Sequence, residues 1–264
     1  MTAPEQFSAV QRSSASQWWV LSARQLRTAV RGGEAVTALI APVVFTVCFY
    51  VPLQKVISMF GNGVENFGQF LMPLIALQAI AFTAISVAFL AATDAVDGIN
   101  TRFASMPISP GVPLGSRVAT GMSKCSVSSA VALGCGHAIG FRFSGTAVDT
   151  AMFLVVLVLI GLALILGADI IGTASKSPEA TTQSLILPQL VLGMLSSGFA
   201  PLEQFPTWVQ PFVRNQPVSQ FTTALRDLAD GTATLSTMTP TALWLFALLA
   251  ICIPLSLLLN TRRS

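Results

Sequence analysis

The spacing of the charged residues limits the fold of this chain more than any other feature. The 264 residues include only 14 Lys and Arg and 11 Asp and Glu. Six long intervals contain none of these four residue types: 35–54, 66–93, 125–141, 150–168, 180–202 and 231–261. A helix that crosses the ~30 Å hydrocarbon core of a bilayer needs about 20 mostly apolar residues. The six intervals therefore predict six membrane-spanning helices.

The composition excludes most water-soluble proteins. Hydrophobic residues make up 53% of the chain and charged residues 9%, whereas a soluble domain carries about 25% charged residues. This balance argues against a disordered tail, a collagen, a coiled coil and almost any soluble enzyme. Lipid offers the backbone no hydrogen-bond partner, so the spans are expected to be helical. Continuous apolar runs such as Phe153–Ile160 lack the alternation of barrel strands.

We therefore predict an all-α integral membrane protein that forms a single domain over residues 1–264. The third span is diluted by Lys124, Gly134, Gly136 and His137, and we expect neighbouring helices to shield it. The predicted spans lie near 35–54, 68–93, 120–141, 150–170, 180–200 and 240–260.

The distribution of Lys and Arg predicts the orientation of these spans. With the N-terminus in the cytoplasm, ten Lys and Arg lie on the cytoplasmic side and four on the other. Cytoplasmic loops are enriched in these residues, so both termini are expected in the cytoplasm and the protein in the plasma (inner) membrane. The net charge of +3 reflects this asymmetry and does not indicate a nucleic-acid partner.

Residues 16–31 have the pattern of an amphipathic helix. Trp18 and Trp19 fall opposite Arg24, Arg27 and Arg31 when the segment is drawn as a helix. A basic face opposite tryptophan suits a helix that lies on the cytoplasmic membrane surface. The alternative is a helix packed on another protein domain.

The segment between the fifth and sixth predicted spans is apolar but too short to cross a bilayer. Its apolar residues recur at about helical spacing between Glu203 and Arg214. We predict a short helical hairpin that enters the outer leaflet with Trp208 near the headgroups; a surface loop is the alternative. The residues assigned to this re-entrant hairpin are Pro201, Pro206, Trp208, Pro211, Arg214, Pro217 and Arg226.

Two cytoplasmic connections carry distinctive residues. The longer, from Asp94 to Lys124, contains Arg102, Phe103 and Met106, a composition typical of docking surfaces but also of an ordinary amphipathic loop. Its prolines, Pro107, Pro110 and Pro113, are expected to prevent a long helix. In the shorter connection, Ser177-Pro178-Glu179 predicts a helix start with Ser177 as N-cap.

Catalytic and metal-binding motifs are missing from the sequence. The segment 167–173 has the glycine spacing of a phosphate-binding loop but no lysine, so the chain is not expected to hydrolyse ATP or to be an enzyme. One histidine, His137, cannot form a metal site, and the four cysteines have no metal-binding spacing. We expect Asp169, at the cytoplasmic end of the fourth span, to extend toward water or to pair with a cytoplasmic partner.

Three segments resemble those of ABC-2 type exporter membrane subunits of the daunorubicin/doxorubicin-resistance type. Segment 97–110, D-G-I-N-T-R-F-A-S-M-P-I-S-P, is similar to the family element G-x-x-x-R-F-x-S-x-P, although Pro110 stands where members often have a basic residue. The others are 176–180, K-S-P-E-A, and the long ordered segment 197–226. The chain is particularly similar to mycobacterial members of the phthiocerol dimycocerosate exporter type.

The resemblance implies a fold and a set of partners. Such subunits have an amphipathic entry helix, six spans and a re-entrant outer hairpin. They pair with an identical or paralogous membrane subunit, and separate ATP-binding subunits hold the ATP and magnesium, so this chain needs no cofactor. The implied cargo is a hydrophobic drug or complex lipid that is moved out of the cytoplasm or inner leaflet. The implied contacts with the ATP-binding subunit are Gly98, Arg102, Phe103, Met106, Pro107, Lys176, Pro178 and Glu179.

Two other function classes remain possible from the residues. An integral-membrane enzyme that modifies lipids would need an interfacial His/Asp or Arg/His constellation. A secondary transporter would place ionisable residues near the middle of its spans or break its helices there. Pro42, Pro73, Pro188 and Pro254 lie within spans, but none has a carboxylate beside it.

Overall fold

The computed structural model describes residues 34–52, 54, 66–99 and 111–262. Its regular structure is helical, and the described residues contain no strand, as predicted. The helices in chain order are α2 (Glu34–Phe45), a π-helix η1 (Thr46–Tyr50), α4 (Phe67–Val96), α6 (Gly111–Ala138), α7 (Ala147–Ala174), α8 (Pro178–Met194), a short 3-10 helix η2 (Leu202–Gln204), α9 (Gln210–Asn215), α10 (Pro217–Asp230) and α11 (Leu235–Arg262).

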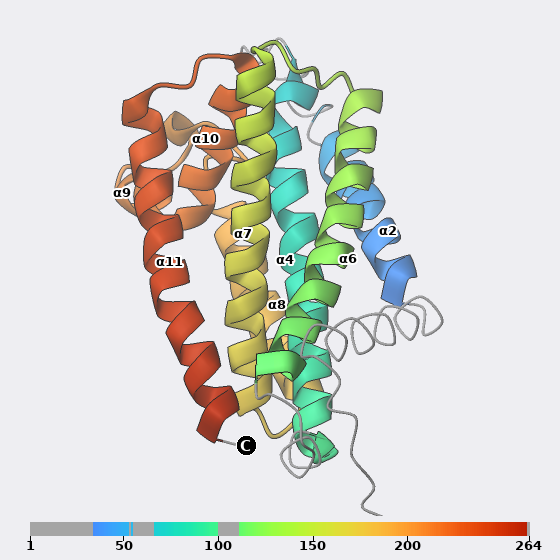
Figure 1. Cartoon of the computed structure of the whole chain (residues 1–264). Helices are drawn as coiled ribbons and strands as arrows, with labels where there is room; N and C mark the ends of the chain where they lie inside the picture. The colour runs from blue at the N-terminus through green and yellow to red at the C-terminus, as the bar shows by residue number, and fades with distance from the viewer. Residues whose placement is uncertain (1–33, 53, 55–65, 100–110, 263–264) are drawn as a thin grey trace, which may run out of the picture.

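Helix α4 is the centre of the bundle. It packs against α2, α6, α7, α8 and α10, and side chains on all of its faces are buried. A helix that is hydrophobic all round belongs in an interior. Figure 1 shows α6, α7 and α11 running along the same long direction as α4, with α9 and α10 gathered at one end.

Within the part of the chain that the structure describes, three helices are long and apolar enough to cross a membrane: Phe67–Val96, Ala147–Ala174 and Leu235–Leu259. Their surroundings differ, because 72% of the most apolar window of α4 is buried but only 11% of that of α11. Helix α11 therefore presents large apolar side chains, such as Phe246 at 74% exposure, to the outside of the bundle. A soluble monomer rarely exposes such a surface, which indicates a multi-pass membrane protein.

The other predicted spans correspond to helices with different bounds. The first coincides with α2 and η1, whose apolar part is the short stretch Ala38–Tyr50. The third predicted span, near 120–141, lies in a helix that begins earlier, because α6 starts at Gly111 and includes Pro113. Proline is tolerated in the first turn of a helix, where its missing N–H has no partner to lose. The fifth ends at Met194, before the predicted boundary of 200.

Local sequence signals explain where α7 and α8 begin. Thr146 caps α7 in a capping box with Asp149, whose carboxylate accepts from the Thr146 backbone N–H. As predicted, Ser177 is the N-cap of α8, with Pro178 at the first helical position and Glu179 in the first turn. The carboxylates of Asp149 and Glu179 each lie in the first turn of a helix, where the positive end of the helix dipole favours negative charge.

Candidate functional site

Part of the predicted docking surface lies in the described residues. Gly98 follows α4 with a positive φ of 68°, a conformation that glycine adopts without strain. Lys176 and Glu179 are exposed and Pro178 is half-buried in the connection between α7 and α8. Figure 1 shows that this connection and the C-terminal end of α4 lie at the same end of the bundle. Arg102, Phe103, Met106 and Pro107 lie outside the described residues, as do Trp18, Trp19, Arg24, Arg27 and Arg31 of the predicted interfacial helix.

A buried ion pair joins α6 to α7 in the half of the bundle nearest this end. Arg117 Nε lies 2.6 Å from Asp169 Oδ1, and the side chains are 6% and 1% exposed. The expectation that Asp169 extends toward water or a cytoplasmic partner is therefore wrong. A carboxylate taken out of water needs an opposite charge nearby, and α6 supplies it because this helix begins before Arg117. The expectation failed because the third predicted span, near 120–141, began after Arg117, whereas α6 begins at Gly111.

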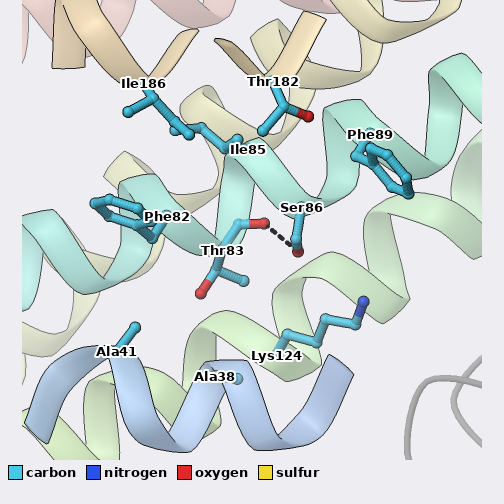
Figure 2. A pocket seen from close by; sticks show the side chains of 10 residues that line it. All are labelled: Ala38, Ala41, Phe82, Thr83, Ile85, Ser86, Phe89, Lys124, Thr182 and Ile186. Atoms are coloured by element: carbon cyan, nitrogen blue, oxygen red, sulfur yellow. Dashed lines mark hydrogen bonds between the residues drawn. The ribbon is translucent and has the colours of Figure 1, made fainter. Parts of the chain in front are cut away.

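Lys124, one of the residues that dilute the third predicted span, lines a pocket of about 260 Å³ between α2, α4, α6 and α8. Figure 2 shows its side chain reaching from α6 into the space between α2 and α4. The residue is 5% exposed, and Gly136 is buried as well, but Gly134 and His137 are exposed, so the expected shielding of the third span holds only in part. Around Lys124 the pocket is mostly apolar, with Ala38 on α2 and Phe82 on α4, and Ser86 donates to the Thr83 carbonyl at 2.7 Å.

The residues assigned to the outer hairpin divide into an exposed part and an anchored part. Trp208 is 82% exposed, and Arg214 is exposed at the end of α9. Pro217 opens α10, and Arg226 on the same helix is half-buried. Gln216 lies between Arg214 and Pro217 in the chain. Its Nε2 donates to the carbonyls of Leu192 and Leu195, which ties the start of α10 to the end of α8.

Arg226 anchors α10 to the central helix. Its guanidinium lies 3.9 Å from the centre of the Phe70 ring, and Nη2 donates to the carbonyls of Phe70 at 3.0 Å and Ser197 at 3.4 Å. Burial lowers the pKa of Arg226 to about 10, while Asp230 and Asp227 act in the opposite direction. Arg226 therefore stays charged at neutral pH and forms a cation–π contact.

Gln69 joins three segments at the end of the bundle where α10 lies. Its Nε2 donates to Asp230 Oδ1 at 2.6 Å and to the Arg142 carbonyl at 2.9 Å, and its Oε1 accepts from the Arg142 backbone N–H at 2.9 Å. This one side chain links α4, the α6–α7 connection and α10. This role of Gln69 was not predicted, although a glutamine inside the charge-free interval 66–93 was a visible signal.

Close helix contacts occur where α4 meets its neighbours. A Cβ at Gly172 of α7 would collide with the Ala88 carbonyl oxygen on α4. A Cβ at Gly193 of α8 would collide with the amide of Gln78, also on α4. Small residues allow such close approach of helices in membranes.

A second, larger pocket lies between α4, α7, α8, α10 and α11. Its volume is about 330 Å³, and it is lined by apolar side chains together with Gln78 and Gln189. None of the described residues that line it is charged. Such a pocket can hold an apolar group but offers no counter-charge for an ion.

The described residues contain no group of three or more His, Cys, Asp and Glu that could hold a metal ion. All four cysteines are free thiols. His137 is exposed, with Nδ1 3.3 Å from the Leu133 carbonyl oxygen. The described part of the chain is thus a helical bundle with polar contacts between its helices.

Comparison with known proteins identifies the family. The model of the family described as "ABC-2 family transporter protein" matches residues 36–258, most of the chain. The chain belongs to the ABC-2 transporter family. The resemblance noted in segments 97–110, 176–180 and 197–226 is thereby confirmed at the level of the family.

Individual relatives of this ABC-2 chain are named as drug-resistance permeases. It is 42% identical over 262 residues to the doxorubicin resistance ABC transporter permease protein DrrB of Mycobacterium tuberculosis, covering 95% of this chain and 91% of the relative. The probable doxorubicin resistance permease DrrC of the same species is 28% identical over 223 residues, or 83% and 79% of the two chains. The daunorubicin resistance permease DrrB1 of Streptomyces coeruleorubidus is 24% identical over 200 residues, or 76% and 70%.

Proposed function

We propose that this chain is the permease subunit of an ABC exporter that moves a hydrophobic drug or lipid-like molecule out of the cytoplasm or inner leaflet. ATP and magnesium would bind a separate ATP-binding subunit. The observation that carries the proposal is the family match over residues 36–258, together with relatives named as drug-resistance permeases. The apolar surface of the bundle supports a path through or beside lipid.

The proposal includes six spans with both termini in the cytoplasm. The spans would be α2 with η1, α4, α6, α7, α8 and α11, and the Lys and Arg count favours this orientation. Helices α9 and α10 would then form the re-entrant hairpin on the outer side. The anchor between Arg226 and Phe70 would hold that hairpin on α4.

Coupling to the ATP-binding subunit would use the cytoplasmic end of the bundle. Segment 98–110 would be the main contact, and Lys176, Pro178 and Glu179 a smaller second one. ATP binding can shift the spans between inward- and outward-open states only through contacts that differ between the two states. The Arg117–Asp169 pair supports this arrangement, because it ties α6, which follows the first contact, to α7, which precedes the second.

The substrate would be amphipathic rather than ionic. The pocket between α4, α7, α8, α10 and α11 is lined by uncharged residues, and doxorubicin appears in the names of relatives. A second membrane subunit, identical to this chain or paralogous like DrrB and DrrC, would complete the transporter in the bilayer.

Transport in inverted membrane vesicles tests the proposal. Vesicles that contain the chain with its ATP-binding subunit are expected to accumulate doxorubicin when ATP is added. A control uses a partner that binds ATP but does not hydrolyse it, and accumulation should then fall to background. Accumulation by this chain without the partner, driven by a proton gradient, would overturn the proposal in favour of a secondary transporter.

A further inference from the structure

We infer that the pocket of about 260 Å³ around Lys124 binds an acidic lipid, in which one negative charge is joined to an apolar chain. We call this space the lysine pocket, defined by Lys124, the hydroxyl residues Thr83, Ser86 and Thr182, and the apolar side chains around them. The lipid is a bound companion of the permease, distinct from its proposed uncharged cargo. The inference rests on the proposed function only in assigning this part of the bundle to the inner leaflet.

The lysine pocket lies close to the points where two helices begin. Ala38 is one turn after the start of α2 at Glu34, and Thr182 is one turn after the start of α8 at Pro178. One turn of an α-helix is about 5.4 Å long. In the proposed topology both helices enter the membrane from the cytoplasm, so the pocket is at the depth where lipid headgroups meet acyl chains.

The pocket can be reached from the side of the bundle. Phe89 on α4 lines it and is 39% exposed, and Ile186 on α8 is half-buried. Helix α2 packs against α4 and α6, whereas α8 packs mainly against α4, so the pocket lies where three helices meet α4. Its volume is below the usual range for drug-sized ligands. It therefore holds the charged group and the first part of a chain, while the rest of the chain stays in the bilayer.

Lys124 sets the sign of the ligand's charge. Its side chain is 5% exposed and reaches from α6 into the space between α2 and α4 (Figure 2). A buried ammonium group favours an anion beside it, because the opposite charge offsets the loss of water. Lys124 already interacts within the protein. An ammonium group has three N–H donors, so it can hold a ligand oxygen as well.

The hydroxyl residues limit the ligand to a single negative charge. Thr83, Ser86 and Thr182 each donate to a backbone carbonyl of their own helix, at 2.9, 2.7 and 3.0 Å. Apart from Lys124, the other described residues of the lining have no N–H or O–H in their side chains. A second negative charge would lack a donor in this pocket. A carboxylate or a phosphodiester therefore fits, and a phosphomonoester or free phosphate does not.

The remaining surface of the pocket requires an apolar body. Ala38 and Ala41 on α2 lie opposite Phe82 and Ile85 on α4, and the small alanine side chains leave the space between them open (Figure 2). A small water-soluble anion at Lys124 would leave this apolar surface in contact with water. An acyl chain covers it, which is favourable in proportion to the area removed from water. The ligand is therefore an amphiphile.

Substitutions of Lys124 separate charge from space. Lys124→Met removes the charge and keeps an unbranched side chain, whereas Lys124→Arg keeps a positive charge at this position. Lys176→Met is the matched control, because Lys176 is an exposed lysine just before α8. Ala41→Leu fills part of the pocket without changing its charge.

Photolabelling with two matched probes is the test. The purified full chain, in a neutral detergent, is labelled with a fatty acid that carries a diazirine in its chain or with the methyl ester of the same acid. We expect the acid to label peptides around the lysine pocket roughly threefold more than the ester, because hydrogen bonds to charged groups are the stronger ones. Lys124→Met should abolish this difference and Lys124→Arg should retain it. Ala41→Leu should reduce labelling by the acid, and Lys176→Met should leave it unchanged.

Competition with unlabelled compounds identifies the source of the charged group. Displacement of the acid probe at a lower concentration of phosphatidylglycerol than of oleate assigns the site to an acidic phospholipid, and the reverse order assigns it to a free fatty acid. Phosphatidylcholine and inorganic phosphate are the controls and should not displace the probe.

Several results would overturn the inference. These are equal labelling of the wild type by acid and ester, an unchanged difference in Lys124→Met, an equal loss in Lys176→Met, or displacement by phosphatidylcholine or inorganic phosphate as effective as that by phosphatidylglycerol. The comparison of acid with ester in the wild type decides the matter even if Lys124→Met fails to fold. Labelling needs neither ATP nor a partner, so its failure would leave the proposed exporter intact. Absence of ATP-dependent doxorubicin uptake would in turn leave the lipid site intact.

Discussion

Arg117 on α6 and Asp169 on α7 form an ion pair at 2.6 Å in the interior of the bundle. The two residues are 52 positions apart in the chain and both are almost completely buried. Each side chain removes from the other the cost of an isolated buried charge. The pair thus links α6 to α7 in this part of the protein.

Removing one member of the pair should be costly. Asp169→Asn leaves the Arg117 charge buried opposite a neutral amide, and loss of one partner of a buried pair typically costs about 3–5 kcal/mol. We expect a clearly lower midpoint of thermal unfolding in detergent. Glu203→Gln, at an exposed carboxylate, is the control and should change stability by less than about 0.5 kcal/mol. Equal midpoints for the two variants would contradict the structural role of the pair.

Arg226→Met should loosen the outer hairpin. The change removes the contact with the Phe70 ring and the hydrogen bonds to the carbonyls of Phe70 and Ser197. A loss of about 1–3 kcal/mol is expected, because hydrogen bonds from a charged donor and a desolvated cation–π contact both disappear. Hydrogen exchange of the α10 backbone amides measures this loss of local stability. Arg214→Met, at an exposed arginine of the same hairpin, should leave that exchange unchanged.

Gly172→Ala tests the close approach of α7 to α4. The added Cβ would collide with the Ala88 carbonyl oxygen, and overpacking of this kind typically costs about 1–3 kcal/mol. The matched change Gly134→Ala meets nothing within 4 Å and should leave stability unchanged or raise it by up to about 1 kcal/mol. Thermal unfolding of both variants gives the comparison, and an equal effect at the two glycines would refute the close contact.

Arg102→Glu and Phe103→Ala test the proposed docking segment. Both are expected to lower co-purification with the ATP-binding subunit and to reduce ATP-dependent transport, without preventing membrane insertion. Arg214→Glu is the control on the proposed outer side and should leave co-purification unchanged. If both docking variants retain the partner at the wild-type level, segment 98–110 is not the main contact.

Local signals predicted much of the helical structure. Charge-free intervals indicate apolar helices because insertion in lipid depends on the residues of a single segment. The start of α8 was predicted correctly, since Ser177, Pro178 and Glu179 cap a helix through contacts within one turn. The bounds of α6 were not predicted, because Pro113 was treated as a helix breaker, although a proline in the first turn disrupts nothing.

The sequence by itself therefore determined that this chain is helical, largely apolar and a member of the ABC-2 family. Only the tertiary structure decided which polar groups meet inside it, such as Arg117 with Asp169, Arg226 with Phe70 and Gln189 with Gln78. The physical reason is that insertion and capping depend on neighbours along the chain. The pairing of a buried polar group depends instead on which helices pack side by side, and the spacing of residues in one segment does not carry that information.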